Sequence, residues 1–252
     1  MPPTLILIRH AEALHNVNRE YHIPDPELSL LGLQQCKDLR DHLRQHLPLA
    51  DEAELVVVSP MRRTLQTALG GLDWLIKKGV RVRVDALWQE NSDKPCDTGS
   101  PIPKLQQEFT QVDFSDLDAT YPEKRSPKDN IYRFTRSAVV ARGQSALASL
   151  YDRPEKVIIV VSHSGFLRCA VSGRRYANAD YRVFEFVEKY SRGQYELKER
   201  ESTEGSGGMG RSEKGVAGIV ETDFPEEEAL NGVEEKLGER TQKEAVAEVP
   251  KN

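Results

Sequence analysis

Three short runs of mostly apolar residues constrain the fold of this chain more than any other feature. They are Thr4 to Ile8, Leu55 to Val58 and Val157 to Val161. None of them alternates apolar with polar residues, which is typical of strands buried on both faces of a mainly parallel sheet. Apolar residues at helical spacing in 33–47 and 65–76 predict helices that cover those faces. The sequence therefore predicts an α/β fold, a three-layer α/β/α sandwich around a mostly parallel sheet.

Further elements are predicted between and after these runs. Residues 80–84 are expected to form another strand, 130–151 a long helix, and 181–187 an alternating strand at the edge of the sheet. Residues 91–129, rich in Pro, Asp, Ser and Gly, do not fit this alternation. We expect them to form an irregular insertion over one end of the sheet, near the active site.

Composition divides the chain near residue 198. Residues 199–252 contain 14 acidic and 7 basic residues, eight glycines, and Phe224 as the only aromatic residue. Such a segment buries too little apolar surface to offset the conformational entropy of ordering it. The expected organisation is a folded domain over 1–198 and an acidic, Gly-rich, disordered tail over 199–252, in which Gly205 to Gly210 is a linker.

Several classes of protein are disfavoured by composition. Cys36, Cys96 and Cys169 are odd in number and widely spaced, which argues against a disulfide framework or a CxxC zinc site. The apolar run after Met1 is too short for a signal peptide, and no run reaches the length of a membrane span. We therefore expect a cytoplasmic protein, with the nucleus as an alternative, and no membrane partner. The balanced charge of 1–198 gives no reason to expect a nucleic-acid partner.

Basic residues follow directly after each of the three apolar runs. The first run is followed by Arg9 and His10, the second by the segment SPMRR, and the third by the segment SHSG. Ligands of open α/β sheets bind at the carboxyl ends of the strands. Clustered cations repel one another unless an anion is present, and the arginine fork matches phosphate. The sequence therefore predicts a phosphate site.

Four sequence blocks resemble one known family. The runs LILIRHAEALHN, LSLLGLQQ, SPMRRTLQTA and VVSHSGFLR resemble the signature blocks of the histidine phosphatase superfamily, in the same order, over roughly residues 4–187. The resemblance implies a phosphoglycerate mutase-like fold. It also implies a metal-independent phosphatase that hydrolyses phosphomonoesters through a phosphohistidine intermediate.

The resemblance implies roles for particular positions. His10 would attack phosphorus, and Arg9, Arg63 and His163 would hold the phosphoryl oxygens. Arg63 matches the family arginine because it lies four residues after the serine of SPMRR, which leaves Arg62 as a solvated helix residue. A neutral imidazole, with an ordinary pKa of about 6.5, is available as a nucleophile at cytosolic pH without a metal.

The remaining site residues are also assigned by the resemblance. Asn16 and Ser164 would contact the substrate, and Ser59 would orient the His10 ring through a hydrogen bond. Glu90, in the segment LWQEN, would donate the proton to the leaving oxygen.

Other readings of these side chains stay open. Asp93 and Asp97 are rival candidates for the acid. His15 could face the substrate or lie at the surface. Histidines near the N-terminus have no clustered carboxylate or cysteine to complete a ligand set, so neither a metal nor a cofactor is predicted. Cys96 has no motif around it and is expected to have a packing role.

Three functions are compatible with these residues. The first is a phosphatase acting on a small phosphorylated substrate. The second is a phosphomutase, which residues 91–129 do not favour because they do not look like mutase insertions. The third is a phosphate-binding or scaffold module without turnover, although no nucleophile or arginine is missing. The sequence selects neither a particular substrate nor an oligomeric state.

Overall fold

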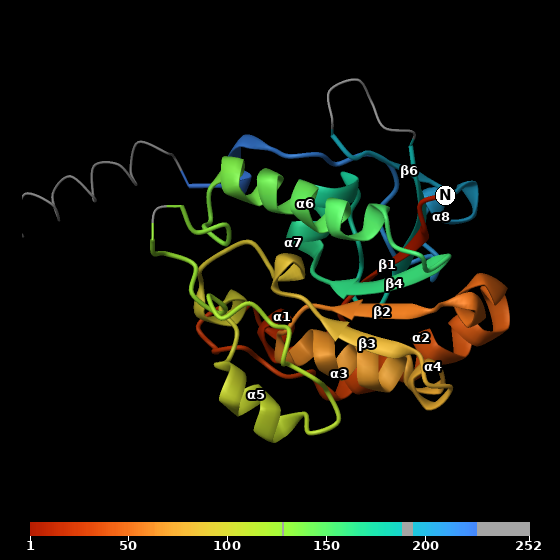
Figure 1. Cartoon of the computed structure of the whole chain (residues 1–252), viewed down its shortest axis with the longest axis horizontal. Helices are drawn as coiled ribbons and strands as arrows, with labels where there is room; N and C mark the ends of the chain where they lie inside the picture. The colour runs from red at the N-terminus through yellow and green to blue at the C-terminus, as the bar shows by residue number, and fades with distance from the viewer. Residues whose placement is uncertain (128, 188–193, 226–252) are drawn as a thin grey trace, which may run out of the picture. The chain divides into compact units, whose positions relative to one another are not determined.

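The computed structural model describes residues 1–127, 129–187 and 194–225, and it contains a six-stranded sheet (Figure 1). The strand order is β3-β2-β4-β1-β5-β6. Strands β3, β2, β4 and β1 pair in parallel, whereas β5 and β6 are antiparallel to their neighbours. The strand bounds are Thr4–Arg9 for β1, Leu55–Val58 for β2, Arg81–Val84 for β3, Val157–Ser162 for β4, Tyr181–Phe186 for β5 and Leu197–Glu199 for β6.

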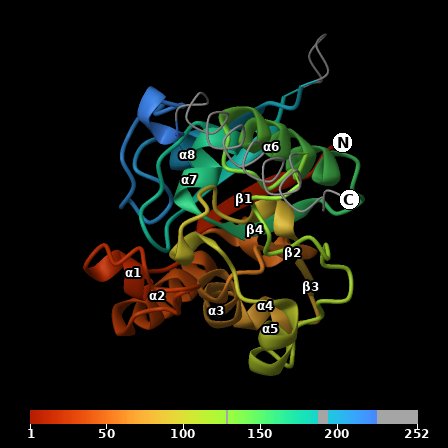
Figure 2. The same cartoon turned by 90° about the vertical axis from the view of Figure 1, so that its left-hand side faces the viewer.

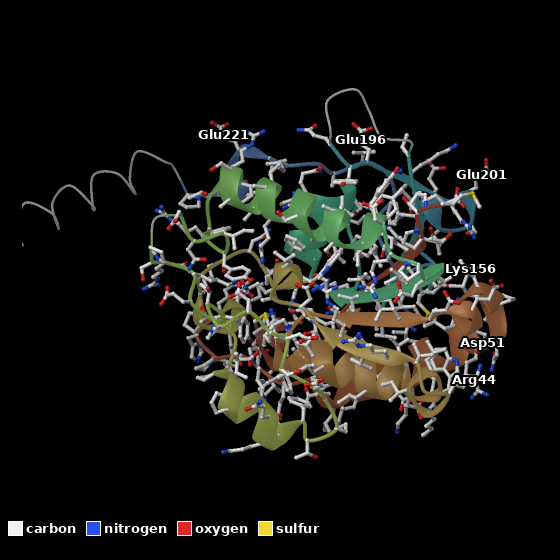
Figure 3. All side chains as sticks on the ribbon, in the orientation of Figure 1. Arg44, Asp51, Lys156, Glu196, Glu201 and Glu221 are labelled. Atoms are coloured by element: carbon white, nitrogen blue, oxygen red, sulfur yellow. The ribbon has the colours of Figure 1, made fainter. Side chains whose placement is uncertain are left out.

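Helices cover both faces of this sheet, which confirms the predicted sandwich. Helices α2, α3 and α4 lie on one face, and α6 and α7 lie on the other (Figures 1 and 2). Side chains fill both spaces between helices and sheet (Figure 3). The helix bounds are Leu14–Val17 for α1, Leu30–His46 for α2, Arg62–Gly71 for α3, Asp73–Lys77 for α4, Ile102–Glu108 for α5, Arg136–Tyr151 for α6, Ser164–Phe166 for α7 and Glu201–Glu204 for α8.

Local side-chain caps explain where the long helices begin. The Ser29 hydroxyl accepts a hydrogen bond from the Gly32 amide at the start of α2. Helix α6 begins at Arg136, six residues later than expected from 130–151, where Thr135 caps it. Upstream, the Asn130 side chain accepts the Tyr132 amide at 2.9 Å, a local bond that competes with helix formation.

The strand expected at the sheet edge is an inner strand. Strand β5 pairs with β1 on one side and with β6 on the other, so β6 forms the edge. The first four residues of β5 are all buried, whether polar or apolar, so the alternation of residue types did not indicate a free edge. Strand β6 was missed because three residues are too few to carry a periodic pattern.

The compact unit that contains the sheet extends past the expected boundary at residue 198. It spans Met1–Ile219. Glu199 is buried and pairs with Arg182 at 2.7 Å and with Arg174 at 2.8 Å. Its charge is neutralised inside the fold, which the acidic composition of 199–252 did not reveal.

The glycine-rich stretch is packed rather than a linker. A Cβ atom on Gly208 would lie 2.0 Å from the Tyr181 ring, and one on Gly207 would lie 2.5 Å from a carboxylate oxygen of Asp180. The glycines allow the backbone to pack closely against Tyr181 and Asp180. Composition alone cannot distinguish this use of glycine from a flexible linker. A second unit spans Val220–Asn252 and contains a short 3-10 turn at Glu221–Asp223. The predicted disorder of the tail concerns residues 226–252 here, and these lie outside the described residues.

The described residues of the insertion over 91–129 include one short α-helix, α5, and add apolar side chains to the core of the domain. Leu105, Phe109 and Tyr121 of the insertion are buried in the main core cluster. Arg62 of α3 pairs with Glu108 of α5 at 2.9 Å. Arg62 lies in helix α3 with its side chain 21% exposed, so it is partly solvated, and its guanidinium connects the insertion to α3.

Replacement of Gly208 by Ala tests the close packing of this stretch. We expect Gly208→Ala to lower the free energy of unfolding by about 2 kcal/mol, since the new methyl group would overlap the Tyr181 ring. Denaturant unfolding measures this change. Gly205→Ala is the matched control, because a Cβ at Gly205 meets no atom within 4 Å. Equal stabilities of the two variants would contradict the packed arrangement.

Candidate active site

Parallel pairing of β1 with β4 brings two histidines together. Arg9 lies opposite Ser162 in the register, so His10 and His163 are the next residues along neighbouring strands. Their ring centroids are 5.2 Å apart, and both side chains are buried. The sequence predicts that the strand ends bring these side chains together. The observed geometry agrees with that prediction.

The hydrogen bonds of His10 select one tautomer. Its Nδ1 lies 2.7 Å from the Ala11 carbonyl oxygen, which can only accept, so Nδ1 carries the proton. The lone pair is then on Nε2, which accepts the Arg63 Nε–H at 3.3 Å. Burial, followed by the charges of Arg63 and Arg9, lowers the pKa of His10 well below 6.5. A neutral imidazole with an unprotonated ring nitrogen can act as a nucleophile once that nitrogen is released from the Arg63 hydrogen bond.

Two arginines flank the His10 ring. Arg63 donates to the Cys96 carbonyl at 2.6 Å and to the Asp97 carboxylate at 3.1 Å. Arg9 donates through Nη1 to the Tyr176 carbonyl at 2.8 Å. Burial lowers the pKa of Arg9 to about 10, so its guanidinium is still charged at neutral pH.

Buried nitrogens around His10 have no partner within the described ranges. They are Arg9 Nε, His15 Nδ1 and His163 Nδ1. Buried polar groups are normally hydrogen bonded, so these nitrogens are available to bind an acceptor. Oxygens of a phosphoryl group could accept from Arg9 and from protonated ring nitrogens.

Ser59 contacts a different histidine from the one expected. Its hydroxyl lies 2.8 Å from His163 Nε2, whereas the prediction paired it with His10. The strand order explains the difference, because β4 lies between β2 and β1 and its end is the neighbour of the β2 end. Ser59 therefore orients the His163 ring.

The short helix α1 places two polar side chains beside His10. His15 is buried with its ring centroid 6.0 Å from that of His10, and burial lowers its pKa to about 4. Asn16 Nδ2 lies 3.0 Å from His15 Nε2, while Asn16 Oδ1 accepts the Asn178 side chain at 3.5 Å. Asn178 also donates to the His10 carbonyl at 3.1 Å and was missed because no motif surrounds it.

Glu90 is held at the first turn after β4. Its carboxylate accepts the Gly165 amide at 3.1 Å and the Phe166 amide at 2.8 Å. A Cβ on Gly165 would lie 2.6 Å from Glu90 Oε1, so this glycine is required for the contact. Ser164 belongs to the same turn, and its hydroxyl lies 3.5 Å from the Tyr176 carbonyl.

Two buried cations that the sequence analysis missed hold the segment that carries Glu90. The Lys124 amine donates to the carbonyls of Glu90 at 2.7 Å, Ser92 at 2.8 Å and Asp97 at 2.6 Å. Arg142 of α6 donates to the Gln89 carbonyl at 2.8 Å. Arg142 interrupts an apolar helix face, and this pattern could have identified it from the sequence. Lys124 lies in the insertion, where no such pattern is present.

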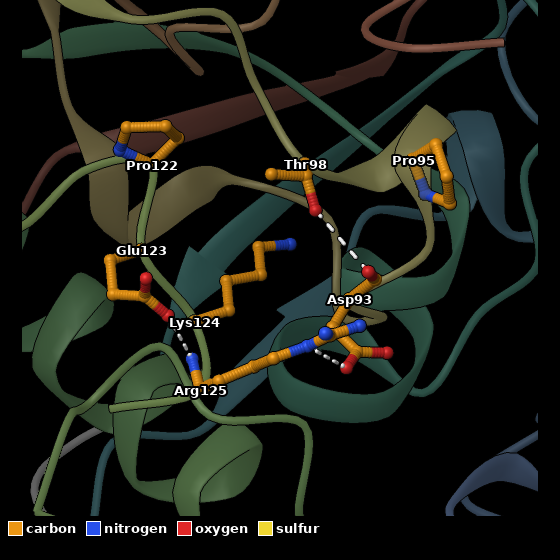
Figure 4. A pocket seen from close by; sticks show the side chains of 7 residues that line it. All are labelled: Asp93, Pro95, Thr98, Pro122, Glu123, Lys124 and Arg125. Atoms are coloured by element: carbon orange, nitrogen blue, oxygen red, sulfur yellow. Dashed lines mark hydrogen bonds and ion pairs between the residues drawn. The ribbon is translucent and has the colours of Figure 1, made fainter. Parts of the chain in front are cut away.

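The rival acids Asp93 and Asp97 both pair with arginines, and Asp97 does so within the site. Asp97 pairs with Arg63 and accepts the Ser92 hydroxyl at 2.6 Å. Asp93 pairs with Arg125 at 2.8 Å on the rim of a cavity of about 430 Å³, between segments 93–98 and 122–125 (Figure 4). Cys96, as expected, is buried and contributes a backbone carbonyl to the site.

The fold and the site together define a phosphoglycerate mutase-like α/β protein. The model that describes the histidine phosphatase superfamily (branch 1) matches residues 5–189, and the chain belongs to this superfamily.

Two relatives agree with this family, and one solved structure has a similar fold. A phosphoglycerate mutase-like protein of Arabidopsis thaliana is 32% identical over 67% of this chain and 73% of its own length. A probable phosphatase of Schizosaccharomyces pombe is 32% identical over 66% of this chain and 76% of its own. The fold resembles that of a putative alpha-ribazole-5'-P phosphatase from Escherichia coli, with a TM-score of 0.50, 19% identity, and coverage of 79% of this chain and 95% of the other.

Neither a membrane-spanning helix nor a metal-binding cluster is present in the part of the chain that the structure describes. No helix in that part of the chain is long and apolar enough to cross a membrane. No group of three or more His, Cys, Asp or Glu side chains there could hold a metal ion.

The protonation state of His10 can be measured directly. We expect its ring to stay neutral from pH 8 to well below pH 6.5, because burial and two arginines disfavour the imidazolium form. NMR titration of the histidine Cε1–H resonances would show no midpoint near 6.5 for the signal that disappears in His10→Ala. A midpoint near 6.5 would contradict the described environment.

Lys124 predicts a pH dependence of stability. Burial lowers its pKa to about 7, whereas a lysine in the unfolded chain has a pKa of about 10.4. Between these two pH values, Lys124 is protonated in the unfolded chain but largely neutral in the folded chain. The free energy of unfolding therefore rises with pH, by up to about 1.4 kcal/mol per pH unit. Urea unfolding at pH 7, 8 and 9 should show a steeper rise for the wild type than for Lys124→Met. Parallel profiles would refute the shift.

Proposed function

We propose that this chain is a metal-independent phosphatase that hydrolyses phosphomonoesters through a phosphohistidine intermediate on His10. The observation that carries the proposal is the neutral His10 ring, with Nδ1 bonded to the Ala11 carbonyl and the Nε2 lone pair facing Arg63. The probable phosphatase among its relatives supports the same activity. The proposed substrate is a small phosphorylated molecule, and the proposed location is the cytoplasm.

The first step of the proposed reaction forms the phosphoenzyme. The His10 Nε2 lone pair exchanges its hydrogen bond from Arg63 Nε–H for a bond to phosphorus, while the bond from phosphorus to the ester oxygen breaks. Arg9, Arg63 and His163 stabilise the charge on the three equatorial oxygens, and removing one such donor costs on the order of 3 kcal/mol of transition-state stabilisation. Glu90, as the carboxylic acid, gives its proton to the leaving alkoxide.

The second step releases phosphate. The Glu90 carboxylate accepts a proton from water as the water oxygen bonds to phosphorus, and the bond from nitrogen to phosphorus breaks. His10 regains its neutral ring, and Glu90 regains its proton. The backbone amides of Gly165 and Phe166 hold the Glu90 carboxylate in place through both steps. Neither step requires a metal ion.

Hydrolysis of an aryl phosphate in the presence of a chelator tests this proposal. We expect the wild type to be active and His10→Ala to be inactive. Glu90→Gln should lower kcat by roughly 10² to 10⁴, because it removes the proton donor, with a smaller loss for substrates whose leaving group is already acidic. Asp93→Asn is the matched control, since its carboxylate pairs with the exposed Arg125, and it should keep near wild-type activity.

Other outcomes would favour the alternatives. Turnover that survives in His10→Ala would contradict the mechanism. Phosphoryl transfer back to the product, rather than to water, would identify a phosphomutase. Tight binding of inorganic phosphate with no phosphoenzyme and no turnover would identify a binding module.

A further inference from the structure

Residues 205–212 lie beyond the part of the chain that the family description covers, yet they pack against a loop that contacts the active site. The family match ends at residue 189. The Gly208 amide donates to the Tyr181 carbonyl at 2.8 Å, and the Ser212 amide donates to the Ser206 carbonyl at 2.7 Å. This segment is therefore an ordered turn against the start of β5.

A closed set of hydrogen bonds connects this segment to Arg9. The Ser212 hydroxyl donates to the Asp180 carboxylate at 2.6 Å and accepts the Ala177 amide at 2.9 Å. The Asp180 carbonyl accepts the Arg9 amide at 3.1 Å. The carbonyl of Tyr176, which precedes Ala177, accepts Arg9 Nη1 at 2.8 Å. Both the backbone and the guanidinium of Arg9 thus bond to the loop that Ser212 holds.

Asp180 is the acidic centre of this arrangement. Its side chain is fully buried, and its carboxylate accepts the amides of Tyr181 and Met209 at 2.8 Å and that of Arg211 at 3.2 Å, besides the Ser212 hydroxyl. A buried carboxylate is tolerated when several donors satisfy it. Three of those donors come from 209–212, so this segment and the loop around Asp180 depend on each other.

Gly207 and Gly208 allow the segment to approach Asp180 so closely. Gly207 has φ +77°, and a Cβ on either glycine would overlap Asp180 or Tyr181. The glycine-rich sequence therefore serves a defined contact next to the site.

We propose that Ser212, with Asp180, is a positioning residue for Arg9, and that residues 205–212 are part of the phosphate-binding unit. The inference rests on the proposed function in one respect, namely that Arg9 binds the phosphoryl oxygens. The Ser212 hydroxyl fixes the distance between the Ala177 amide and the Asp180 carboxylate. Through the Tyr176 carbonyl it sets the orientation of the guanidinium, whose Nε is without a partner among the described residues.

The test measures the affinity of the full chain for inorganic phosphate by calorimetry, together with kcat and KM for an aryl phosphate. Ser212→Ala should weaken phosphate binding about tenfold and lower kcat/KM by a similar factor, as a misoriented charged donor loses most of its effect. Ser212→Thr, which keeps the hydroxyl, should restore both values. Ser202→Ala, at an exposed serine of α8, is the matched control and should behave as the wild type.

Each outcome decides the inference. Wild-type phosphate affinity in Ser212→Ala would overturn it, even if the variant melts at a lower temperature. Where Ser212→Ala does not fold, Ser212→Cys keeps the side-chain volume with a weak hydrogen-bonding group and should show the same loss of affinity. A wild-type chain that binds phosphate but hydrolyses nothing would contradict the proposed function alone, because the affinities still decide the role of Ser212. A wild type that binds no phosphate would overturn this inference.

Discussion

The parallel pairing of β1 with β4 is the constraint on which the candidate site depends. Because Arg9 lies opposite Ser162, His10 and His163 leave their strands at the same level and meet with ring centroids 5.2 Å apart. The next strand, β2, ends beside β4, so its serine, Ser59, contacts the second histidine. A shift of one residue in this register would turn each of these side chains to the opposite face of the sheet.

Burial of several cations in one place is the main electrostatic cost of this arrangement. Backbone carbonyls and a few carboxylates offset it: the Cys96 carbonyl and Asp97 for Arg63, the Tyr176 carbonyl for Arg9, and three carbonyls for Lys124. Donors held this way do not need to reorganise when an anion arrives, which is how preorganised sites stabilise developing charge. Burial, and after it the charges of Arg63 and Arg9, lowers the pKa of His10 and keeps its ring neutral.

Two segments without a periodic apolar pattern form the surroundings of this site. The insertion at 91–129 carries the partners of Arg63 and the amine that holds the Glu90 segment. The stretch at 199–219 pairs Glu199 with Arg182 and surrounds Asp180 with donors. Both are stabilised by hydrogen bonds and ion pairs rather than by a periodic apolar face, so their composition resembles that of loops and tails.

The sequence by itself determined the sandwich, the family and the histidines and arginines of the candidate site. Buried parallel strands leave continuous apolar runs, and the site residues follow them at fixed positions. Only the tertiary structure decided that Ser59 orients His163, that Lys124 and Arg142 hold the Glu90 segment, and that the Gly-rich stretch packs against Asp180. Those contacts join residues far apart in the chain through single polar atoms or close backbone approach. Contacts of these two kinds produce no periodicity and no motif in the sequence.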